Sequence, residues 1–398
     1  MHNPLKDSGL PLFFKISDGD PQLSKTLESL HGQSVRLWVR SLSIMQKEAI
    51  VSSSLSGNSW RLASDEGAYL AGQDEAPCPL SFLTTGMVCS YMEEILALAD
   101  QRNIIIRDIK LIQDNYYTMK GSALKGTMIG GAKNIDLAAE IDSDADKVTL
   151  TALVHDAVAA SPLNGLMRGH KKSLFTLTHN GKEIETDRAL RLARSALDSP
   201  VVAFDASEPE HGDWDGLIIK GAMTPRTLET VTLAGDSLKE EQDRTLHLRG
   251  ICTIRPDGIK QVEQQLFNPH GSTFTFLCEE TVIEGKGNCQ SRAPDAASYI
   301  AAGIGFCFMT QFGRHAKITQ KNLKNYQIIQ DIHFSVGGAT GGTGKAGSAA
   351  PVETHVYLET GEDDAFARNL LDMAEQTCFL HAFCKADLKA KVTVTKSA

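Results

Sequence analysis

Two cysteines in similar settings, each with a partner downstream, are the residues of this chain best suited to chemistry. Cys307 precedes Cys378 by 71 residues, and Cys89 precedes Ser161 by 72. Cys89 and Cys307 lie near the start of apolar, helix-like segments, where backbone N–H groups favour an anion and lower the pKa of a thiol. Cys307 and Cys378 could therefore act as a nucleophilic thiol and its resolving partner. The alternative is that each cysteine is a small buried hydrophobic residue.

Other clusters of polar residues are weaker candidates. Cys378, His381 and Cys384 have a spacing compatible with metal binding, but a fourth ligand is not evident and no metal is expected. Two acidic pairs are interpreted as turn and surface charges, because nothing pairs them with a nucleophile: Asp65 with Glu66, and Glu279 with Glu280. The cysteine thiols are therefore the stronger candidates for a reactive site.

The segments that carry these cysteines repeat each other. Residues 60–100 and 275–315 each contain a strand-like end, an acidic pair, a Gly-rich turn, a proline and an apolar helical segment with a glycine shortly before a cysteine. Upstream, Arg40 precedes Asp65 by 25 residues and Arg255 precedes Glu279 by 24. Two copies of one domain are the simplest explanation, and two copies suit a packed pair rather than a solenoid.

Each copy is expected to open with strands and to continue with two helices. SVRLWVRSLS and EAIVSSSLS predict strands in the first copy, and TLHLRGICTI and KQVEQQLFN predict strands in the second. Strands grouped apart from helices indicate an α+β fold, with each antiparallel sheet packed around a buried central helix. The expected organisation is residues 1–182 as repeat 1, residues 183–244 as a connecting segment with a charged helix (ETDRALRLARSALDS), and residues 245–398 as repeat 2.

Composition restricts the classes of protein that the chain could belong to. The 398 residues include 40 Lys+Arg and 49 Asp+Glu, a formal charge of −9, so a nucleic-acid partner is not expected. Eight cysteines are too few for a disulfide scaffold and fit a reducing compartment. The first twenty residues lack a signal-peptide pattern. Residues 296–313 are uncharged but include polar side chains, which favours a buried helix over a membrane span. A cytoplasmic location is predicted.

The sequence resembles the OsmC/Ohr family, the osmotically inducible and organic-hydroperoxide-resistance proteins. The run DEGAYLAGQDEAPCPLSFLTTGMVC is similar to the family's Gly-rich turn and proline before the helix with the reactive cysteine. The family's second cysteine lies in a Cys-Pro segment after a second helix. SPLNGLMRG resembles this segment with Ser161 in place of the cysteine, and CFLHAF resembles it with Cys378 kept and Phe379 in place of the proline.

The resemblance implies a fold, a reaction and a set of site residues. Family members are intertwined dimers that reduce organic hydroperoxides, and a tandem chain would be such a dimer fused into one polypeptide with pseudo-twofold symmetry. By position, Cys307 would attack the peroxide and Cys378 would resolve the sulfenic acid as a disulfide. Arg255, with Arg40 as its counterpart in the first copy, would hold the thiolate; the alternative is an ordinary turn arginine. An external dithiol, possibly lipoyl-type, would be the reductant, and no cofactor is implied.

The sequence also departs from the family pattern, which keeps a second interpretation open. Leu80 stands where the family has an active-site Glu, and the first copy, with Cys89 but no resolving cysteine, is interpreted as degenerate. The alternative is a non-catalytic protein that binds a small apolar or lipid-like ligand between the repeats, against Phe306, Phe308, Met309 and Phe312; plain core packing would equally explain these residues. The chain is expected to be a monomer with an internal pseudo-dimer, or a homodimer of such units.

Overall fold

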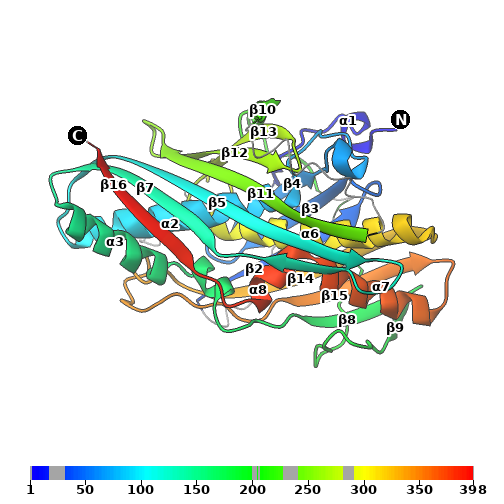
Figure 1. Cartoon of the computed structure of the whole chain (residues 1–398). Helices are drawn as coiled ribbons and strands as arrows, with labels where there is room; N and C mark the ends of the chain where they lie inside the picture. The colour runs from blue at the N-terminus through cyan, green and yellow to red at the C-terminus, as the bar shows by residue number, and fades with distance from the viewer. Residues whose placement is uncertain are drawn as a thin grey trace.

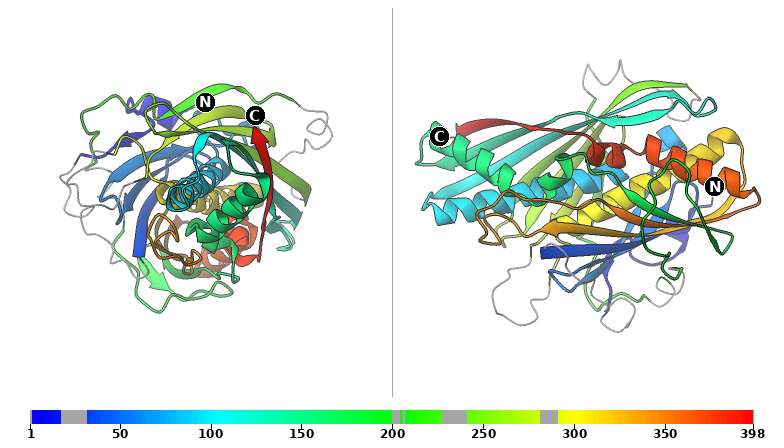
Figure 2. Two further views of the ribbon diagram at one scale, coloured as in Figure 1. Left: turned by 90° about the vertical axis from the view of Figure 1, so that its left-hand side faces the viewer. Right: turned by 90° about the horizontal axis from the view of Figure 1, so that it is seen from below.

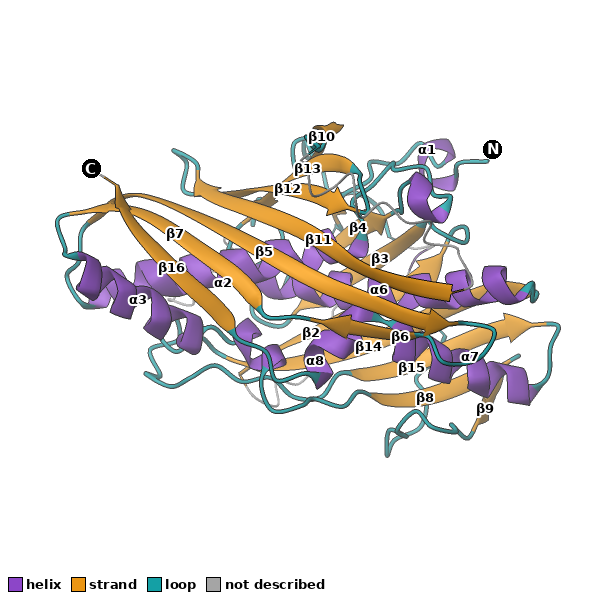
Figure 3. Cartoon of the chain, in the orientation of Figure 1, coloured by secondary structure: helices purple, strands orange, loops and turns teal. Residues whose placement is uncertain are grey.

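The computed structural model describes residues 2–17, 32–199, 204, 207–226, 241–280 and 291–397. Its strands form two large β-sheets, and two long helices lie between them (Figures 1 and 3). Seen end-on, strands surround the paired helices (Figure 2). The predicted α+β class is therefore confirmed.

The first sheet combines strands from both ends of the sequence. Its eight strands, in spatial order, are β1 (Phe14–Lys15), β4 (Ser59–Ser64), β3 (Lys47–Ser53), β2 (Gly32–Ser41), β14 (Leu323–Ser335), β15 (Glu353–Thr360), β8 (Leu174–His179) and β9 (Lys182–Ile184). The predicted strands at 34–43 and 48–56 are thus β2 and β3. They pair with each other as a hairpin, and β2 then pairs with β14, which lies almost 300 residues later.

The second sheet is built in the same way with the halves exchanged. Its strands, in spatial order, are β10 (Ile218–Met223), β13 (Ser272–Cys278), β12 (Lys260–Asn268), β11 (Glu241–Ile254), β5 (Ile106–Ser122), β7 (Ile135–Ser143) and β16 (Ala390–Ser397), with β6 (Ile129–Ala132) paired to β5. The strands predicted at 245–254 and 260–268 are β11 and β12. Here β11, from the second half of the sequence, pairs with β5 from the first half.

In each sheet the halves meet at one antiparallel junction, β2 with β14 or β11 with β5, and the same kind of ion pair bridges both of these junctions. Arg36 on β2 binds Asp331 on β14 (Nε–Oδ1 2.7 Å), and Arg249 on β11 binds Asp114 on β5 (Nη2–Oδ2 2.8 Å). Each carboxylate lies 217 positions from its counterpart and each arginine 213. The two junctions are therefore equivalent in structure.

Both sheets are mixed, which corrects the expectation of antiparallel sheets. β15 pairs with β8 in parallel, and β7 pairs with β16 in parallel. Each parallel pair joins strands that are distant in the sequence, which a tight hairpin turn could not connect. Each sheet therefore needs strands from both halves of the chain.

The two central helices, α2 (Pro79–Gln101) and α6 (Ala296–Thr319), are the helices that the apolar segments predict. α6 begins where the Asp295 carboxylate accepts a hydrogen bond from Ser298 N (2.7 Å), and α2 begins at a proline. α6 packs against β2, β3 and β14 of the first sheet, whereas α2 packs against β5, β11 and β12 of the second. The order of layers is sheet, α6, α2, sheet.

Two glycines let the central helices cross closely. A Cβ added at Gly86 would lie 2.4 Å from the carbonyl oxygen of Ala296, and one added at Gly303 would lie 2.8 Å from the backbone nitrogen of Leu83. Only a residue without a side chain fits at either point, since both distances are shorter than van der Waals contact. The close crossing brings the start of each helix beside the middle of the other.

Shorter helices cover the ends of this pair. They are α1 (Pro4–Asp7), η1 (Ala68–Leu70), α3 (Lys147–Ala160), η2 (Leu163–Met167), α7 (Asp364–Thr377) and α8 (Phe379–Lys385). α3 and η2 contact α2, and α7 and α8 contact α6. The second helix of each half therefore lies beside the central helix of the same half.

The connecting segment differs from the prediction. Residues 185–199 form no helix. Instead the Asp372 carboxylate on α7 accepts hydrogen bonds from the backbone N–H groups of Arg188 and Ala189 (3.1 and 2.8 Å), and Arg191 forms a bridge with Phe175. These tertiary contacts hold the segment extended despite its helical pattern. Further along, β10 extends the second sheet, and β11 begins before residue 245.

In the part of the chain that the structure describes, one helix, α2, is long and apolar enough to cross a membrane by length and composition, and it is mostly buried inside the protein. α6, which contains the uncharged stretch 296–313, is buried from Ala296 to Ala316. Both helices thus have the packing of core helices.

Candidate active site

The structure brings Cys307 and Cys378 together. Cys307 lies in the middle of α6, and Cys378 lies at the bend between α7 and α8. The Cys378 Sγ donates a hydrogen bond to the Cys307 Sγ across 3.4 Å, and both residues are almost wholly buried. The Cys378 Sγ also accepts from the backbone N–H of His381 (3.5 Å). Because a disulfide bond is about 2.05 Å long, a small movement of either side chain would allow one to form.

The bend that carries Cys378 is held by a strand from the other half of the sequence. β6 passes so close that a Cβ at Gly130 would lie 2.5 Å from the Thr377 carbonyl oxygen. The Gln376 side chain donates to the Met128 carbonyl (2.7 Å), which fixes the end of α7 beside β6. The position of the second thiol therefore depends on contacts between the two halves.

Charged groups from the first half lie beside Cys307. The Glu66 carboxylate accepts hydrogen bonds from Thr310 Oγ1, one turn after Cys307, at 3.1 Å and from the Tyr69 hydroxyl at 2.7 Å. Lys47 is fully buried, and its ammonium donates to the Met45 carbonyl (2.8 Å). These groups were missed in the sequence, where Glu66 was expected at the surface; in fact it is 5% exposed.

Burial shifts the pKa of each of these groups toward its neutral form. Burial lowers the pKa of Lys47, and the negative charges of Glu66, Asp65 and Cys307 oppose this. Burial raises the pKa of Glu66, which the Lys47 ammonium opposes. Burial, followed by the Cys378 side chain, raises the pKa of Cys307 well above its usual value. The expected lowering of this pKa by a helix N-terminus is wrong, because Cys307 lies eleven residues inside α6.

A cavity of about 30 Å³ adjoins the Cys307 thiol. Its walls include Glu66, Arg244, Arg314 and Phe379, together with apolar residues of α2, β11 and β12. This space is comparable to the volume of one water molecule in the liquid. A larger organic molecule can therefore reach the thiol only after the walls move apart.

The predicted arginines lie elsewhere. Arg255 lies at the turn between β11 and β12, where it pairs with Asp257 (3.2 Å), and it is not part of the cavity wall. Arg40 pairs with Glu48 (2.5 Å) and stacks over the Phe204 ring. Arg40 and Arg255 are also not counterparts of each other. The equivalent ion pairs of the two sheets align Arg36 with Arg249, 213 positions later, so the residue that corresponds to Arg40 is Thr253.

The cationic side chains in the wall are instead Arg244 and Arg314. Arg314 is 3% exposed, and burial lowers the pKa of its guanidinium to about 9. It lies on α6 two turns after Cys307. The sequence contained a signal for this position, because a residue seven positions after Cys307 in a helix lies on the same face as the cysteine.

Cys89 lies apart from both thiols. Its side chain faces Cys252 and Cys278 of the second sheet, and burial raises its pKa well above the usual value. The third member of the proposed metal spacing, Cys384, is also buried, and burial raises its pKa to about 12. Within the described part of the chain, no group of three or more His, Cys, Asp or Glu is arranged to hold a metal ion.

The structural counterpart of Cys307 is Ser90, one residue after Cys89. Ser90 and Ser161 lie 217 positions before Cys307 and Cys378, and their hydroxyl oxygens are 2.7 Å apart. The two glycines of the helix crossing are separated by the same 217 positions. A serine pair therefore occupies in the first half the place that the cysteine pair occupies in the second.

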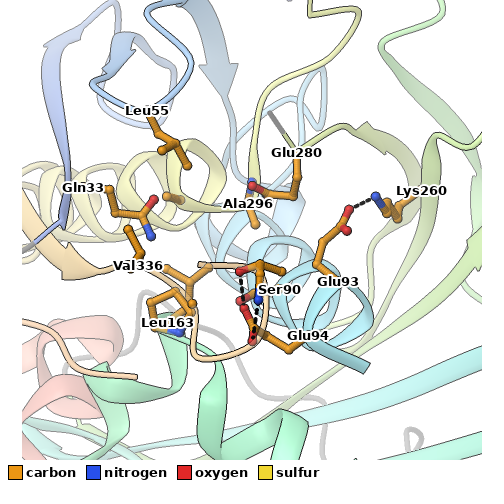
Figure 4. A pocket seen from close by; sticks show the side chains of 14 residues that line it. Gln33, Leu55, Ser90, Glu93, Glu94, Leu163, Lys260, Glu280, Ala296 and Val336 are labelled. Atoms are coloured by element: carbon orange, nitrogen blue, oxygen red, sulfur yellow. Dashed lines mark hydrogen bonds and ion pairs between the residues drawn. The ribbon is translucent and has the colours of Figure 1, made fainter. Parts of the chain in front are cut away.

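A second cavity, of about 380 Å³, lies beside this serine pair (Figure 4). Its wall includes Ser90, Glu93, Glu94, Lys260 and Glu280. Lys260 and Glu280 correspond in position to Lys47 and Glu66 of the cysteine site. Glu280 was expected to be a surface charge, whereas burial raises its pKa to about 7.

Comparisons with known proteins give little beyond these observations. No protein-family model matches the chain. No curated protein matches it. Among solved structures, it is similar to the crystal structure of an OsmC-like hydroperoxide resistance protein from Jannaschia sp. CCS1, with 20% sequence identity and a TM-score of 0.21; the match covers 33% of this chain and 83% of that one.

Proposed function

We propose that this chain is a tandem, two-copy member of the OsmC/Ohr family and reduces organic hydroperoxides with Cys307 and Cys378. The observation that carries the proposal is the 3.4 Å separation of the two buried sulfur atoms, which come from segments 71 residues apart. In this proposal residues 1–182 and 245–398 are the two copies. The equivalent sheet junctions and helix crossing support an internal pseudo-twofold arrangement.

The reaction would proceed in two steps within the protein. The Cys307 thiolate attacks the terminal oxygen of the hydroperoxide; the O–O bond breaks, the alkoxide takes a proton and leaves as an alcohol, and Cys307 becomes a sulfenic acid. The Cys378 sulfur then attacks the Cys307 sulfur, water leaves, and a disulfide forms. An external dithiol restores both thiols by exchange. The family resemblance suggests that this dithiol is lipoyl-type.

The thiolate needed for the first step requires help from its surroundings. Burial disfavours the charged thiolate. A cation close by stabilises it strongly, because little water is present to screen the two charges. The Lys47 ammonium interacts favourably with the Cys307 sulfur, and Arg314 lies in the wall of the same cavity. We assign to Lys47 the charge-stabilising role that the sequence assigned to Arg255.

The test is a thiol count on the fully reduced protein after one equivalent of cumene hydroperoxide. Wild-type protein should lose two thiols, Cys307→Ser should lose none rapidly, and Cys378→Ser should accumulate a sulfenic acid. Cys89→Ser is the matched control, because this buried cysteine contacts neither thiol, and it should behave as wild type. Loss no faster than that of free cysteine would reject the peroxidase.

The alternative function, binding of an apolar ligand against the aromatic residues of α6, lacks a supporting observation. The four residues that would line such a groove are fully buried in the core and form no part of either cavity wall: Phe306, Phe308, Met309 and Phe312. Their burial is explained by packing between the first sheet, α2 and α8. The contact between the two thiols therefore favours the redox function.

A further inference from the structure

The cavity beside Ser90 has the size of a ligand site. Small-molecule pockets have volumes of roughly 300–1,000 Å³, and this one measures about 380 Å³. It is much larger than the space beside Cys307, although the two lie at equivalent positions. Ser90 and Ser161 cannot form a disulfide, so the cavity is not a second copy of the redox site.

The balance of charge in the walls of the two cavities differs: the cysteine cavity has two arginines and one glutamate, and the serine cavity has three glutamates and one lysine. On α6 the cysteine cavity is lined by Thr310, Gln311 and Arg314. The residues 217 positions earlier on α2 are Glu93, Glu94 and Ala97. Thus α6 supplies a guanidinium to the cysteine cavity, whereas α2 supplies two carboxylates to the serine cavity. The serine cavity is suited to a positively charged occupant.

The carboxylates of the serine cavity differ in what they already bind. Glu93 forms an ion pair with Lys260. Glu94 accepts hydrogen bonds from the Ala339 backbone N–H (2.7 Å) and the Thr340 hydroxyl (2.5 Å), which hold a loop in place.

Glu280 forms no close ion pair among the described residues. Burial and then the charge of the Asp295 carboxylate raise its pKa, and the more weakly felt Lys260 ammonium opposes this. The Glu280 carboxylate accepts a hydrogen bond from the Ala296 backbone N–H (2.8 Å). Bringing an ammonium group into contact with it would create a charge-assisted hydrogen bond in a partly dry site, where such bonds are strongest.

We propose that the cavity beside Ser90 binds a small organic cation, with its ammonium group at Glu280 and its apolar body against Leu55, Leu163 and Val336. These three side chains form the apolar part of the wall, opposite the carboxylates (Figure 4). The proposal does not depend on the peroxidase activity, because it uses neither Cys307 nor Cys378.

The probe is 2-phenylethylamine, titrated by calorimetry into the full-length protein at pH 8, above the pKa of about 7 to which burial raises Glu280. 2-Phenylethanol and phenylacetate have the same apolar body with a neutral and an anionic head. We expect the amine to bind at one site per chain, at least about tenfold more tightly than the alcohol, since hydrogen bonds to charged groups contribute that much. Phenylacetate should not compete. Equal binding of amine and alcohol, or no binding of the amine, would overturn the proposal.

Variants locate the binding site. Glu280→Gln should weaken amine binding about tenfold and leave alcohol binding unchanged. Glu279→Gln is the matched control, because Glu279 pairs with Arg292 outside the cavity wall, and its amine affinity should equal that of wild type. Ala297→Leu keeps every charge but narrows the cavity, and it should weaken all cavity ligands. Unchanged amine binding in both Glu280→Gln and Ala297→Leu would place the amine elsewhere.

Discussion

At the scale of single residues, the site consists of two buried sulfur atoms in contact, with Lys47 and Glu66 of the other half beside Cys307. The spacing of Cys307 and Cys378 suggested a pair, and the structure places their sulfur atoms in contact. Lys47 and Glu66 could not be predicted from local patterns, because they reach Cys307 only through the interleaving of the two halves. The choice of Arg255 relied on a hairpin position, and its side chain faces Asp257 at an exposed turn.

Lys47→Met tests the cation assigned to Cys307. Because the pKa of Cys307 is raised, its alkylation rate should climb with pH as the thiolate forms. Loss of the Lys47 ammonium should raise this pKa further, so that the rise moves to higher pH and alkylation at pH 8 slows by about fivefold or more. The measurement is the rate of iodoacetamide labelling of Cys307 against pH, by peptide mass spectrometry.

The matched control for this prediction is Lys260→Met. Lys260 occupies the equivalent place in the serine cavity, where it pairs with Glu93, so its loss should leave the Cys307 labelling profile unchanged. A Lys47→Met profile that overlays the wild-type profile would show that the ammonium does not stabilise the thiolate.

At the scale of elements, the strand-forming and apolar runs of the sequence predicted the long strands and the central helices. β2, β3, β11 and β12 lie where strands were predicted, and α2 and α6 follow the apolar segments. The predicted helix at residues 185–199 is absent because Asp372 binds backbone N–H groups of this segment directly. Such a contact depends on a residue of α7 that lies 184 positions after Arg188, and it leaves no mark in the local sequence.

The helix crossing gives a prediction whose sign is opposite to the usual one. An alanine in place of a helical glycine ordinarily stabilises by roughly 0.5–1 kcal/mol. At Gly86 the new Cβ would lie 2.4 Å from the Ala296 carbonyl oxygen, so Gly86→Ala should instead lower the free energy of unfolding by about 1–3 kcal/mol, as overpacking does. Urea denaturation measures the change. Gly216→Ala, whose Cβ would meet nothing within 4 Å, should be neutral, and a Gly86→Ala protein as stable as wild type would contradict the close crossing.

At the scale of the whole molecule, the two halves share both sheets. In each sheet two adjacent strands from one half, β14 and β15 or β5 and β7, lie between strands from the other half. Each thiol or serine pair lies next to charged residues of the opposite half. The sequence predicted two similar halves. It did not predict the exchange of strands, because pairing between distant strands leaves no local pattern. The sequence pattern matched Cys89 with Cys307, one residue away from Ser90, because residue types rather than positions were compared.

Introducing cysteines into the first half tests this equivalence. In a Cys307→Ser, Cys378→Ser background, the double change Ser90→Cys with Ser161→Cys should produce a new dithiol that oxidises to a disulfide. Ser161→Cys alone should not form one, because Cys89 faces Cys252 and Cys278 on another side of α2. Peptide mapping under non-reducing conditions distinguishes the two. A disulfide between Cys89 and the thiol introduced by Ser161→Cys, found in the single variant, would show that the alignment of the halves is wrong.

The most direct test of the redox site is the rate at which one equivalent of cumene hydroperoxide converts the reduced protein into a species with a mapped Cys307–Cys378 disulfide. The structure predicts a single disulfide, formed much faster than free cysteine reacts and absent from both Cys307→Ser and Cys378→Ser. A protein that keeps both thiols, or that oxidises other cysteines first, would contradict the assignment of this pair as the active site.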